Sequence, residues 1–304
     1  MYNDACTVNN MTASRSDGRV EGLDYTKYNN RVFECMSMYL NLAPRFINEK
    51  LYKNTGGDEM AYAALLAAVC MLDTVNSADD KLLYRKYFIP MVHRLDPRDF
   101  EDDPYYKNIR FEEKSEGGWR ITNMSCEPYE AFVCGDPQIM PDGRILPQIG
   151  YFERGFGYPA VLQDGREWMT LMPNETVTTL PHVRRAHGNV LTFGLGLGYF
   201  AYRAALLPQV SEVTVVELDE NVIKLFCENI LPQMECRDKI RIVCDDAFAY
   251  AEKNLPSDYD FVFTDIWHDP SDGVGLYLKM KEIAEKAPGP EYAYWLEDTL
   301  RLYI

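Results

Sequence analysis

Carboxylates follow three short apolar segments in the second half of the chain. Glu217 ends the segment "VTVVE", and Asp265 follows "FVFT". Between them, Asp245 and Asp246 follow "IRIVC". A carboxylate can accept hydrogen bonds from both hydroxyls of a ribose, receive an amino group, or take a proton from a reacting amine. These positions therefore favour a ligand that carries a sugar and amino groups.

Three alternating glycines precede these acids. The stretch "FGLGLGYF" places Gly194, Gly196 and Gly198 between an apolar segment and a segment with helical periodicity. Glycine has no Cβ atom, so the turn is tight and its main chain can approach a ligand closely. Glu217 lies 19 residues after Gly198, the spacing at which a strand-end acid binds ribose in nucleotide-binding folds. The alternative is a turn that only packs a strand against a helix. The predicted cofactor-binding residues are Gly194, Leu195, Gly196, Gly198, Glu217, Asp245 and Asp246.

Candidate catalytic residues lie in "FVFTDIWHDP". Asp265, His268 and Asp269 would follow one strand, where a carboxylate or an imidazole could keep an amine neutral or take its proton. His268 could equally be a surface loop residue. Asp269 precedes Pro270, a pair that is also typical of a turn.

Strands and helices are predicted to alternate from His187 onward. This alternation indicates a doubly wound α/β domain with a Rossmann-like parallel sheet. Because the carboxyl ends of parallel strands meet at one edge, the glycine turn and the acids should line a single crevice. The predicted strands are 189–194, 212–218, 239–245, 259–266 and 291–297, and the predicted helices are 199–207, 220–230, 247–254 and 275–286.

The sequence before His187 has a different pattern of apolar and turn-forming residues. Apolar periodicity indicates helices, and Pro44 and Pro90 should end or kink two of them. Asp164-Gly165 predicts a β-hairpin. The expected organisation is a disordered tail (1–24), a helical region (25–102), a small β-rich region with a hairpin (103–186) and the Rossmann-like cofactor-binding domain (187–304).

Composition excludes several classes of function. The chain has 304 residues, 47% of them hydrophobic and 26% charged, which is typical of a globular protein. A formal net charge of −16 repels phosphate backbones, so no nucleic-acid partner is expected. The eight cysteines lack metal-ligand spacing, so no metal is expected.

No targeting or membrane segment is evident in the sequence. The first twenty residues contain no apolar run typical of a signal peptide. The apolar stretch Met60–Leu72 is too short to span a bilayer and predicts a buried helix capped by Asp58. We therefore expect a cytoplasmic protein without a membrane partner, and self-association into a homodimer is left open.

Residues 190–285 resemble the class I S-adenosylmethionine-dependent methyltransferase fold. Within that superfamily they are most similar to the spermidine synthase (polyamine aminopropyltransferase) group. The segments "VTVVELDENVI" and "DYDFVFTD" resemble the second and fourth strands of that group. The hairpin "AVLQDGREWMTLMPNE" resembles its N-terminal β region, so the resemblance covers about residues 150–285.

The resemblance implies roles for the residues named above. The three glycines would flank the methionine part and the ribose of the cofactor, Glu217 would bind the ribose hydroxyls, and Asp246 would bind the adenine. Asp265 would be the acid that helps to deprotonate an attacking amine. Trp168, Asn174 and Glu175 could contribute to the wall of the site, or could simply pack on the sheet.

Two departures from the aminopropyltransferase pattern affect the predicted reaction. Leu197 stands where that group usually carries an aspartate that holds the amine of the decarboxylated cofactor. "DIWHD" has three residues between its aspartates where the group has two. We therefore expect a methyltransferase that uses S-adenosylmethionine, rather than its decarboxylated form, on a small molecule such as an amine. The alternatives are a spermidine synthase-like aminopropyltransferase, a non-catalytic nucleoside-binding module and a dinucleotide-dependent oxidoreductase.

Overall fold

The computed structural model describes residues 24–255 and 259–304. The described residues divide into two compact units, one formed by residues 24–99 and 125–156 and the other by residues 100–124, 157–255 and 259–304. We call them unit 1 and unit 2. The boundaries between them fall within helix α6 (Pro97–Glu101), strand β3 (Trp119–Cys126) and strand β6 (Phe156–Gln163). Each unit has its own hydrophobic core.

Unit 2 contains the five-stranded parallel sheet that the sequence predicts. Its strand order is β10-β9-β8-β11-β12, and every neighbouring pair is parallel. The first strand in sequence, β8, therefore lies in the middle, and the order reverses after β10. A reversal of this kind creates a crevice at the carboxyl ends of the strands. The strands are β8 (Gly188–Phe193), β9 (Val210–Glu217), β10 (Ile240–Cys244), β11 (Phe261–Thr264) and β12 (Glu291–Tyr294).

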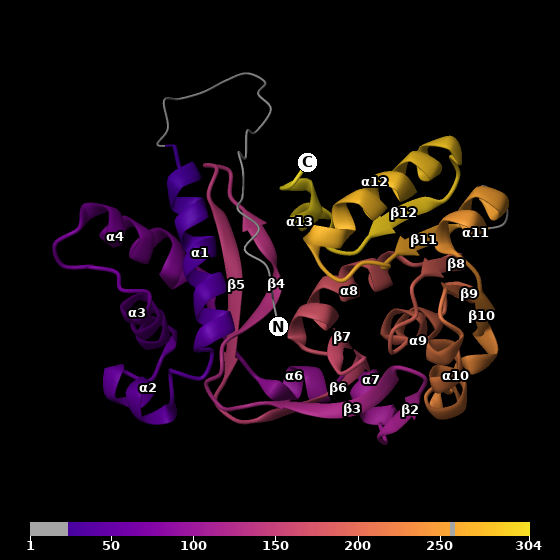
Figure 1. Cartoon of the computed structure of the whole chain (residues 1–304), viewed down its shortest axis with the longest axis horizontal. Helices are drawn as coiled ribbons and strands as arrows, with labels where there is room; N and C mark the ends of the chain where they lie inside the picture. Colours follow the sequence, from indigo (N-terminus) through magenta and orange to yellow (C-terminus); the bar gives the residue numbers. More distant parts are fainter. Residues whose placement is uncertain (1–23, 256–258) are drawn as a thin grey trace. The chain divides into compact units, whose positions relative to one another are not determined.

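Helices cover both faces of this sheet. Figure 1 shows α9 and α10 on one side of the strands and α11 and α12 on the other. The strands are buried on both faces, which explains why "VLTF" and "FVFT" are continuous apolar runs. The Rossmann-like fold class expected from the sequence is confirmed. The helices of this unit are α7 (Pro104–Asn108), α8 (Pro173–Arg185), α9 (Tyr199–Ala205), α10 (Glu220–Asn229), α11 (Ala247–Asn254), α12 (Pro270–Lys286) and α13 (Glu297–Arg301), with short 3₁₀ turns at Leu231–Gln233 and Arg237–Lys239.

A second sheet has the order β2-β3-β6-β7. It adds β2 (Lys114–Glu116) and β7 (Arg166–Thr170) to β3 and β6. Asp164 and Gly165 form the two-residue turn between β6 and β7, and both have positive φ angles, of 50° and 80°. Such a turn matches the twist of the two strands, and it confirms the hairpin predicted from this dipeptide.

Unit 1 is built from helices and a three-stranded sheet with the order β1-β5-β4. Asp58 caps α3 by accepting a hydrogen bond from the backbone N–H of Ala61 at 2.8 Å, as the sequence predicts. Pro90 follows a π-helical turn, and Pro44 follows the end of α1. The elements are α1 (Thr26–Leu42), α2 (Glu49–Thr55), α3 (Glu59–Val69), α4 (Ala78–Leu83), the π-helix η1 (Tyr84–Phe88), α5 (Ile89–Met91), β1 (Val92–Leu95), β4 (Phe132–Ile139) and β5 (Ile145–Phe152).

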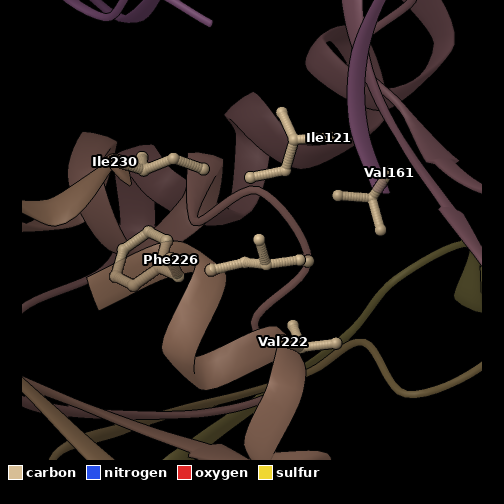
Figure 2. A pocket seen from close by; sticks show the side chains of 7 residues that line it. Ile121, Val161, Val222, Phe226 and Ile230 are labelled. Atoms are coloured by element: carbon tan, nitrogen blue, oxygen red, sulfur yellow. The ribbon is translucent and has the colours of Figure 1, made fainter. Parts of the chain in front are cut away.

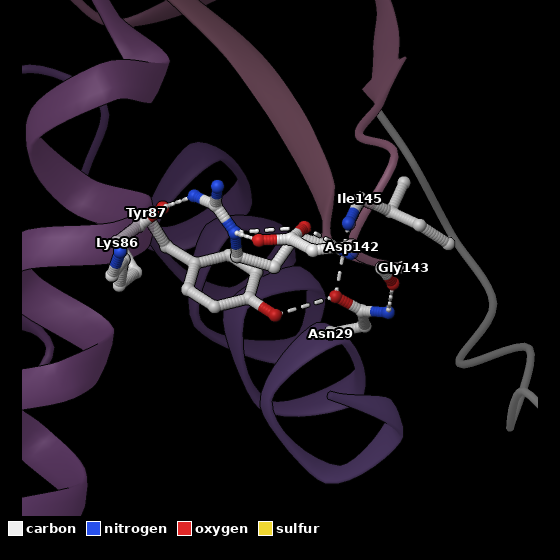
Figure 3. Close-up of polar contacts among 7 residues, drawn as sticks. Asn29, Lys86, Tyr87, Asp142, Gly143 and Ile145 are labelled. Atoms are coloured by element: carbon white, nitrogen blue, oxygen red, sulfur yellow. Dashed lines mark hydrogen bonds and ion pairs between the residues drawn. The ribbon is translucent and has the colours of Figure 1, made fainter. Parts of the chain in front are cut away.

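A buried asparagine joins α1 to the β4–β5 turn in unit 1 (Figure 3). The side-chain amide of Asn29 donates to the carbonyl of Gly143 at 3.0 Å. Its oxygen accepts the hydroxyl of Tyr87 at 2.7 Å and the backbone N–H of Ile145 at 3.0 Å. Because the side chain is only 6% exposed, these bonds replace those it would form with water.

The boundaries of the ranges expected from the sequence differ from the boundaries of the two units. The β-rich range 103–186 is divided between them, because β4 and β5 pair with β1 of unit 1 whereas β7 pairs with β6 in the second sheet. Disorder was expected for residues 1–24, and all of these but Asp24 lie outside the described residues. Among the described helices, none has the length and apolarity needed to cross a membrane.

Candidate functional site at the carboxyl edge of the parallel sheet

The glycine turn is in close contact with three other segments of unit 2. Gly194 has a φ of 95°, and a Cβ atom there would lie 1.9 Å from the carbonyl oxygen of Asp265. A Cβ atom on Gly196 would lie 2.3 Å from Sδ of Met169, and one on Gly198 would lie 2.3 Å from Cε2 of Phe226. The Asp265 carbonyl therefore requires glycine at position 194, and the positive φ angles of 49° and 75° favour glycine at positions 196 and 198, whether or not a ligand approaches the turn.

Glu217 joins the turns that follow β8, β9 and β10. Its Oε2 accepts the backbone N–H of Leu195 at 3.1 Å, and its Oε1 accepts those of Leu218 and Asp219 at 2.8 and 3.0 Å. Its backbone carbonyl accepts the N–H of Asp245 at 3.1 Å. The carboxylate is thus held against the glycine turn. Two carboxylate oxygens can accept about four hydrogen bonds, so capacity remains for a ligand hydroxyl.

Asp245 and Asp246 lie at the end of β10 and are exposed. Asp246 is the N-cap of α11, where its Oδ1 accepts the N–H groups of Phe248 and Ala249 at 3.0 and 2.9 Å. Asp245 accepts the N–H of Asp246 at 2.9 Å through Oδ1. Both side chains therefore have local structural roles, and both lie next to the Glu217 turn.

Asp265 is a carboxylate with altered acidity at this edge of the sheet. The side chain is half-buried at the end of β11, and loss of solvation raises its pKa to about 7. Burial, together with the charge of Asp265, raises the pKa of Glu175 in the first turn of α8 well above its usual value. Both shifts favour the protonated form and oppose ionisation of both groups together, which suits exchange of a proton with an amine.

His268 and Asp269 have structural contacts after β11. Asp269 is the N-cap of α12, where its Oδ1 accepts the N–H of Ser271 at 2.6 Å and Asp272 completes a capping box. Burial opposes ionisation of Asp269, yet the hydrogen bonds from Ser271 hold its pKa below the usual value. His268 is exposed, and its Nε2 lies 3.1 Å from the carbonyl oxygen of Glu167.

Strand β7 lies against these turns. Besides the contact of Glu167 with His268, the ring of Trp168 lies 5.9 Å from that of His268. The backbone N–H of Leu197 donates to Sδ of Met169 at 3.3 Å. Sequence reasoning placed Trp168 in this region but missed Met169. Its contact depends on how the hairpin folds back on the sheet, so no local pattern could have indicated it.

The other side of the turn is apolar. A cavity of about 10 Å³, no larger than one water molecule requires, borders Gly196. Figure 2 shows Ile121, Val161 and Phe226 turned toward this space. A larger cavity of about 270 Å³, with Tyr106, Arg110 and Tyr158 in its wall, shares no residue with the strand-end turns. No three His, Cys, Asp or Glu side chains among the described residues form a group that could hold a metal ion.

Comparisons with known proteins agree with the resemblance seen in the sequence. Residues 171–278 match the sequence model of the spermine/spermidine synthase domain. A polyamine aminopropyltransferase from Prochlorococcus marinus (strain MIT 9312) is 32% identical over 122 residues, which is 37% of this chain and 42% of that protein. The chain therefore matches less than half the length of this curated relative.

Solved structures with a similar arrangement include two spermidine synthases and a methyltransferase. The enzyme from Thermotoga maritima has a TM-score of 0.37 at 15% identity, covering 64% of this chain and 61% of its own. A spermidine synthase in complex with the transition state analogue AdoDATO has a TM-score of 0.37 at 18% identity, and the match covers 60% of this chain and 57% of that one. The 23S rRNA methyltransferase ErmE has a TM-score of 0.30 at 20% identity, and the match covers 38% of this chain and 43% of that one. Over residues 171–278 the chain is similar to the spermine/spermidine synthase domain, and its parallel sheet is Rossmann-like.

Proposed function

We propose that this chain transfers an aminopropyl group from a nucleoside sulfonium to an amine. The observation that carries the proposal is the half-buried carboxyl of Asp265, with a pKa of about 7, on the residue whose backbone carbonyl contacts Gly194 of the glycine turn. A base is most useful when its pKa lies near the working pH. The match of residues 171–278 to the spermine/spermidine synthase domain supports the same reaction, in preference to the methyl transfer expected from the sequence.

The strand-end residues fit a nucleoside. Glu217 would accept the ribose hydroxyls, because three backbone N–H groups already fix its orientation. Asp246 would receive the amino group of adenine through Oδ2, since its Oδ1 caps α11. When bound, decarboxylated S-adenosylmethionine would supply a carbon activated by its sulfonium. The chain itself would orient the two reactants, which is the main requirement of a displacement reaction.

Asp265 and Glu175 would act on the amine. An alkylammonium ion is not a nucleophile until it loses a proton, and ionised Asp265 would accept that proton. Glu175, with its raised pKa, would stay protonated and leave the pair with a single negative charge. One negative charge would attract a cationic amine without the repulsion between two ionised carboxylates.

Methyl transfer to an amine is the second candidate. Leu197 favours it, because this buried apolar side chain stands where the aminopropyltransferase pattern has an aspartate. A leucine cannot hold the ammonium group of a decarboxylated cofactor, although both reactions could use the same base.

A product assay distinguishes the two reactions. The protein is incubated with 1,4-diaminobutane and either S-adenosylmethionine or its decarboxylated form, and the products are identified by mass spectrometry. Aminopropyl transfer gives 5′-methylthioadenosine and a triamine from the decarboxylated form alone. Methyl transfer gives S-adenosylhomocysteine and a methylated amine. Absence of both products, with nucleoside binding intact, would support a non-catalytic module.

A further inference from the structure

We propose that Met169 determines which nucleosides the site accepts: its thioether covers the glycine turn and disfavours ligands with a long substituent on the 5′ sulfur. This inference rests on the nucleoside site of the proposed function. It concerns ligand choice, which the fold alone does not specify.

The turn offers few places for a ligand to meet the backbone, and Met169 occupies one of them. The amide N–H of Leu197 donates to Sδ of Met169 at 3.3 Å. The same sulfur fills the space that a side chain on Gly196 would occupy, 2.3 Å from the ideal Cβ position. On the other side, Phe226 lies against Gly198. A ligand that approached Gly196 from the side of β7 would therefore meet the thioether first.

Met169 is held over the turn by its strand. It pairs with Val161 of β6 in an antiparallel register, and Val161 is buried. Two residues before Met169, the carbonyl of Glu167 contacts the His268 ring. The side chain of Met169 itself is only half-buried and has three rotatable bonds. The backbone of β7 is thus fixed, while the thioether can leave the turn at a modest free-energy cost.

The position of the turn decides which part of a ligand meets Met169. In nucleotide-binding folds with a glycine turn after the first strand, the acid at the end of the second strand holds the ribose and the 5′ substituent lies at the turn. With the ribose on Glu217, a long aminopropyl or aminocarboxypropyl chain on the 5′ sulfur must displace the thioether. The short methyl group of 5′-methylthioadenosine need not displace it.

Calorimetric titration tests this directly. Wild type, Met169→Ala and Met169→Leu are each titrated with S-adenosylmethionine, its decarboxylated form and 5′-methylthioadenosine. Met140→Ala, the same change at a half-buried position of unit 1, is the matched control. A neutral hydrogen bond contributes about 0.5–1.5 kcal/mol, or roughly a 2- to 12-fold change in affinity. Met169→Ala should therefore bind both long-chain ligands about fivefold more tightly, with less than about twofold change for 5′-methylthioadenosine.

Met169→Leu covers the turn without offering an acceptor and preserves core volume. Its affinity for the long-chain ligands should lie between those of wild type and Met169→Ala. If Met169→Ala does not fold, the comparison of Met169→Leu with wild type provides the test. Equal changes for long-chain and short-chain ligands, or no change in either variant, would overturn the role of Met169 while leaving the nucleoside site intact. Binding of none of the three nucleosides to any variant would overturn the proposed function, and this inference with it.

Discussion

The backbone N–H of Leu195 donates to Oε2 of Glu217 at 3.1 Å, which joins the glycine turn after β8 to the acid at the end of β9. The bond orients the carboxylate before any ligand arrives. Because Oε1 accepts two further N–H groups from the residues that follow, the carboxylate has little freedom to rotate. The proposed ribose site is therefore formed by the protein alone.

Glu217→Gln should weaken nucleoside binding and also lower stability. The amide nitrogen of glutamine cannot accept a hydrogen bond, so at least one backbone N–H would lose its partner, at a cost of about 1–3 kcal/mol. We expect nucleoside affinity to fall at least about tenfold by calorimetry. Glu212→Gln on the same strand, at an exposed position paired with Arg241, is the matched control. Unchanged affinity in Glu217→Gln would place the ribose elsewhere.

Asp265 should make stability depend on pH between about 4 and 7. The folded state has a raised pKa of about 7 at this carboxyl, whereas the unfolded chain titrates near 4. In that window the folded state binds more protons, so the free energy of unfolding falls as pH rises. Asp265→Asn removes this effect and should gain stability relative to wild type, by up to about 4 kcal/mol at pH 8. Denaturant unfolding of both proteins at pH 5 and pH 8 measures this difference in stability. If the stability of Asp265→Asn relative to wild type did not increase with pH, the raised pKa of Asp265 would be contradicted.

The same carboxyl should control the pH dependence of the reaction. Asp265 accepts a proton only when ionised, so the rate should rise through about pH 7 in wild type. Asp265→Asn should lose about 10²- to 10⁴-fold in rate. A steady-state assay with 1,4-diaminobutane across pH 5.5–9 provides the profile. A variant that kept the wild-type rate and pH profile would remove Asp265 from the chemistry.

Asp269→Ala should act on stability rather than on the reaction. Loss of an N-cap costs about 0.5–2 kcal/mol, and this cap begins α12. Since the pKa of Asp269 is lowered in the folded protein, its contribution is present above about pH 4 and lost as the pH falls through the folded pKa. Thermal unfolding and the diamine assay measure both effects. A hundredfold loss of rate without a loss of stability would make Asp269 a catalytic residue.

Asn29→Ala should destabilise unit 1. The substitution leaves the hydroxyl of Tyr87 and the buried N–H of Ile145 without their shared acceptor. We expect a loss of about 2–4 kcal/mol in the free energy of unfolding, because unpaired buried polar groups cost about 1–3 kcal/mol each. Asn41→Ala, an exposed residue of the same helix with one bond to the Ser37 carbonyl, should change stability by less than about 0.5 kcal/mol. Equal effects of the two substitutions would contradict this.

Features set by neighbouring residues could be predicted from the sequence. The Asp164-Gly165 turn, the Asp58 cap and the alternation of strands and helices after His187 depend on local backbone preference and hydrophobic periodicity. At Asp269-Pro270 the sequence predicts only a turn, with a helix from residue 275, whereas α12 begins at Pro270 with Asp269 as its N-cap.

Contacts between segments far apart in the chain could not be predicted in this way. The parallel pairing of Val92 with Ile149 joins part of the expected β-rich range to unit 1. Hydrophobic periodicity does not indicate which strand will be the partner. The contact of Met169 with the glycine turn depends on how the β6–β7 hairpin packs against that turn. The raised pKa of Asp265 depends on burial by surrounding side chains, which composition near "FVFTD" does not specify.

A crystal structure of the protein with 5′-methylthioadenosine would show directly where the nucleoside binds. We expect the ribose hydroxyls within hydrogen-bond distance of Glu217 and the 5′ sulfur beside Gly196 and Met169. A nucleoside bound away from the carboxyl ends of β8 and β9, with Glu217 in contact only with its own backbone neighbours, would contradict this expectation.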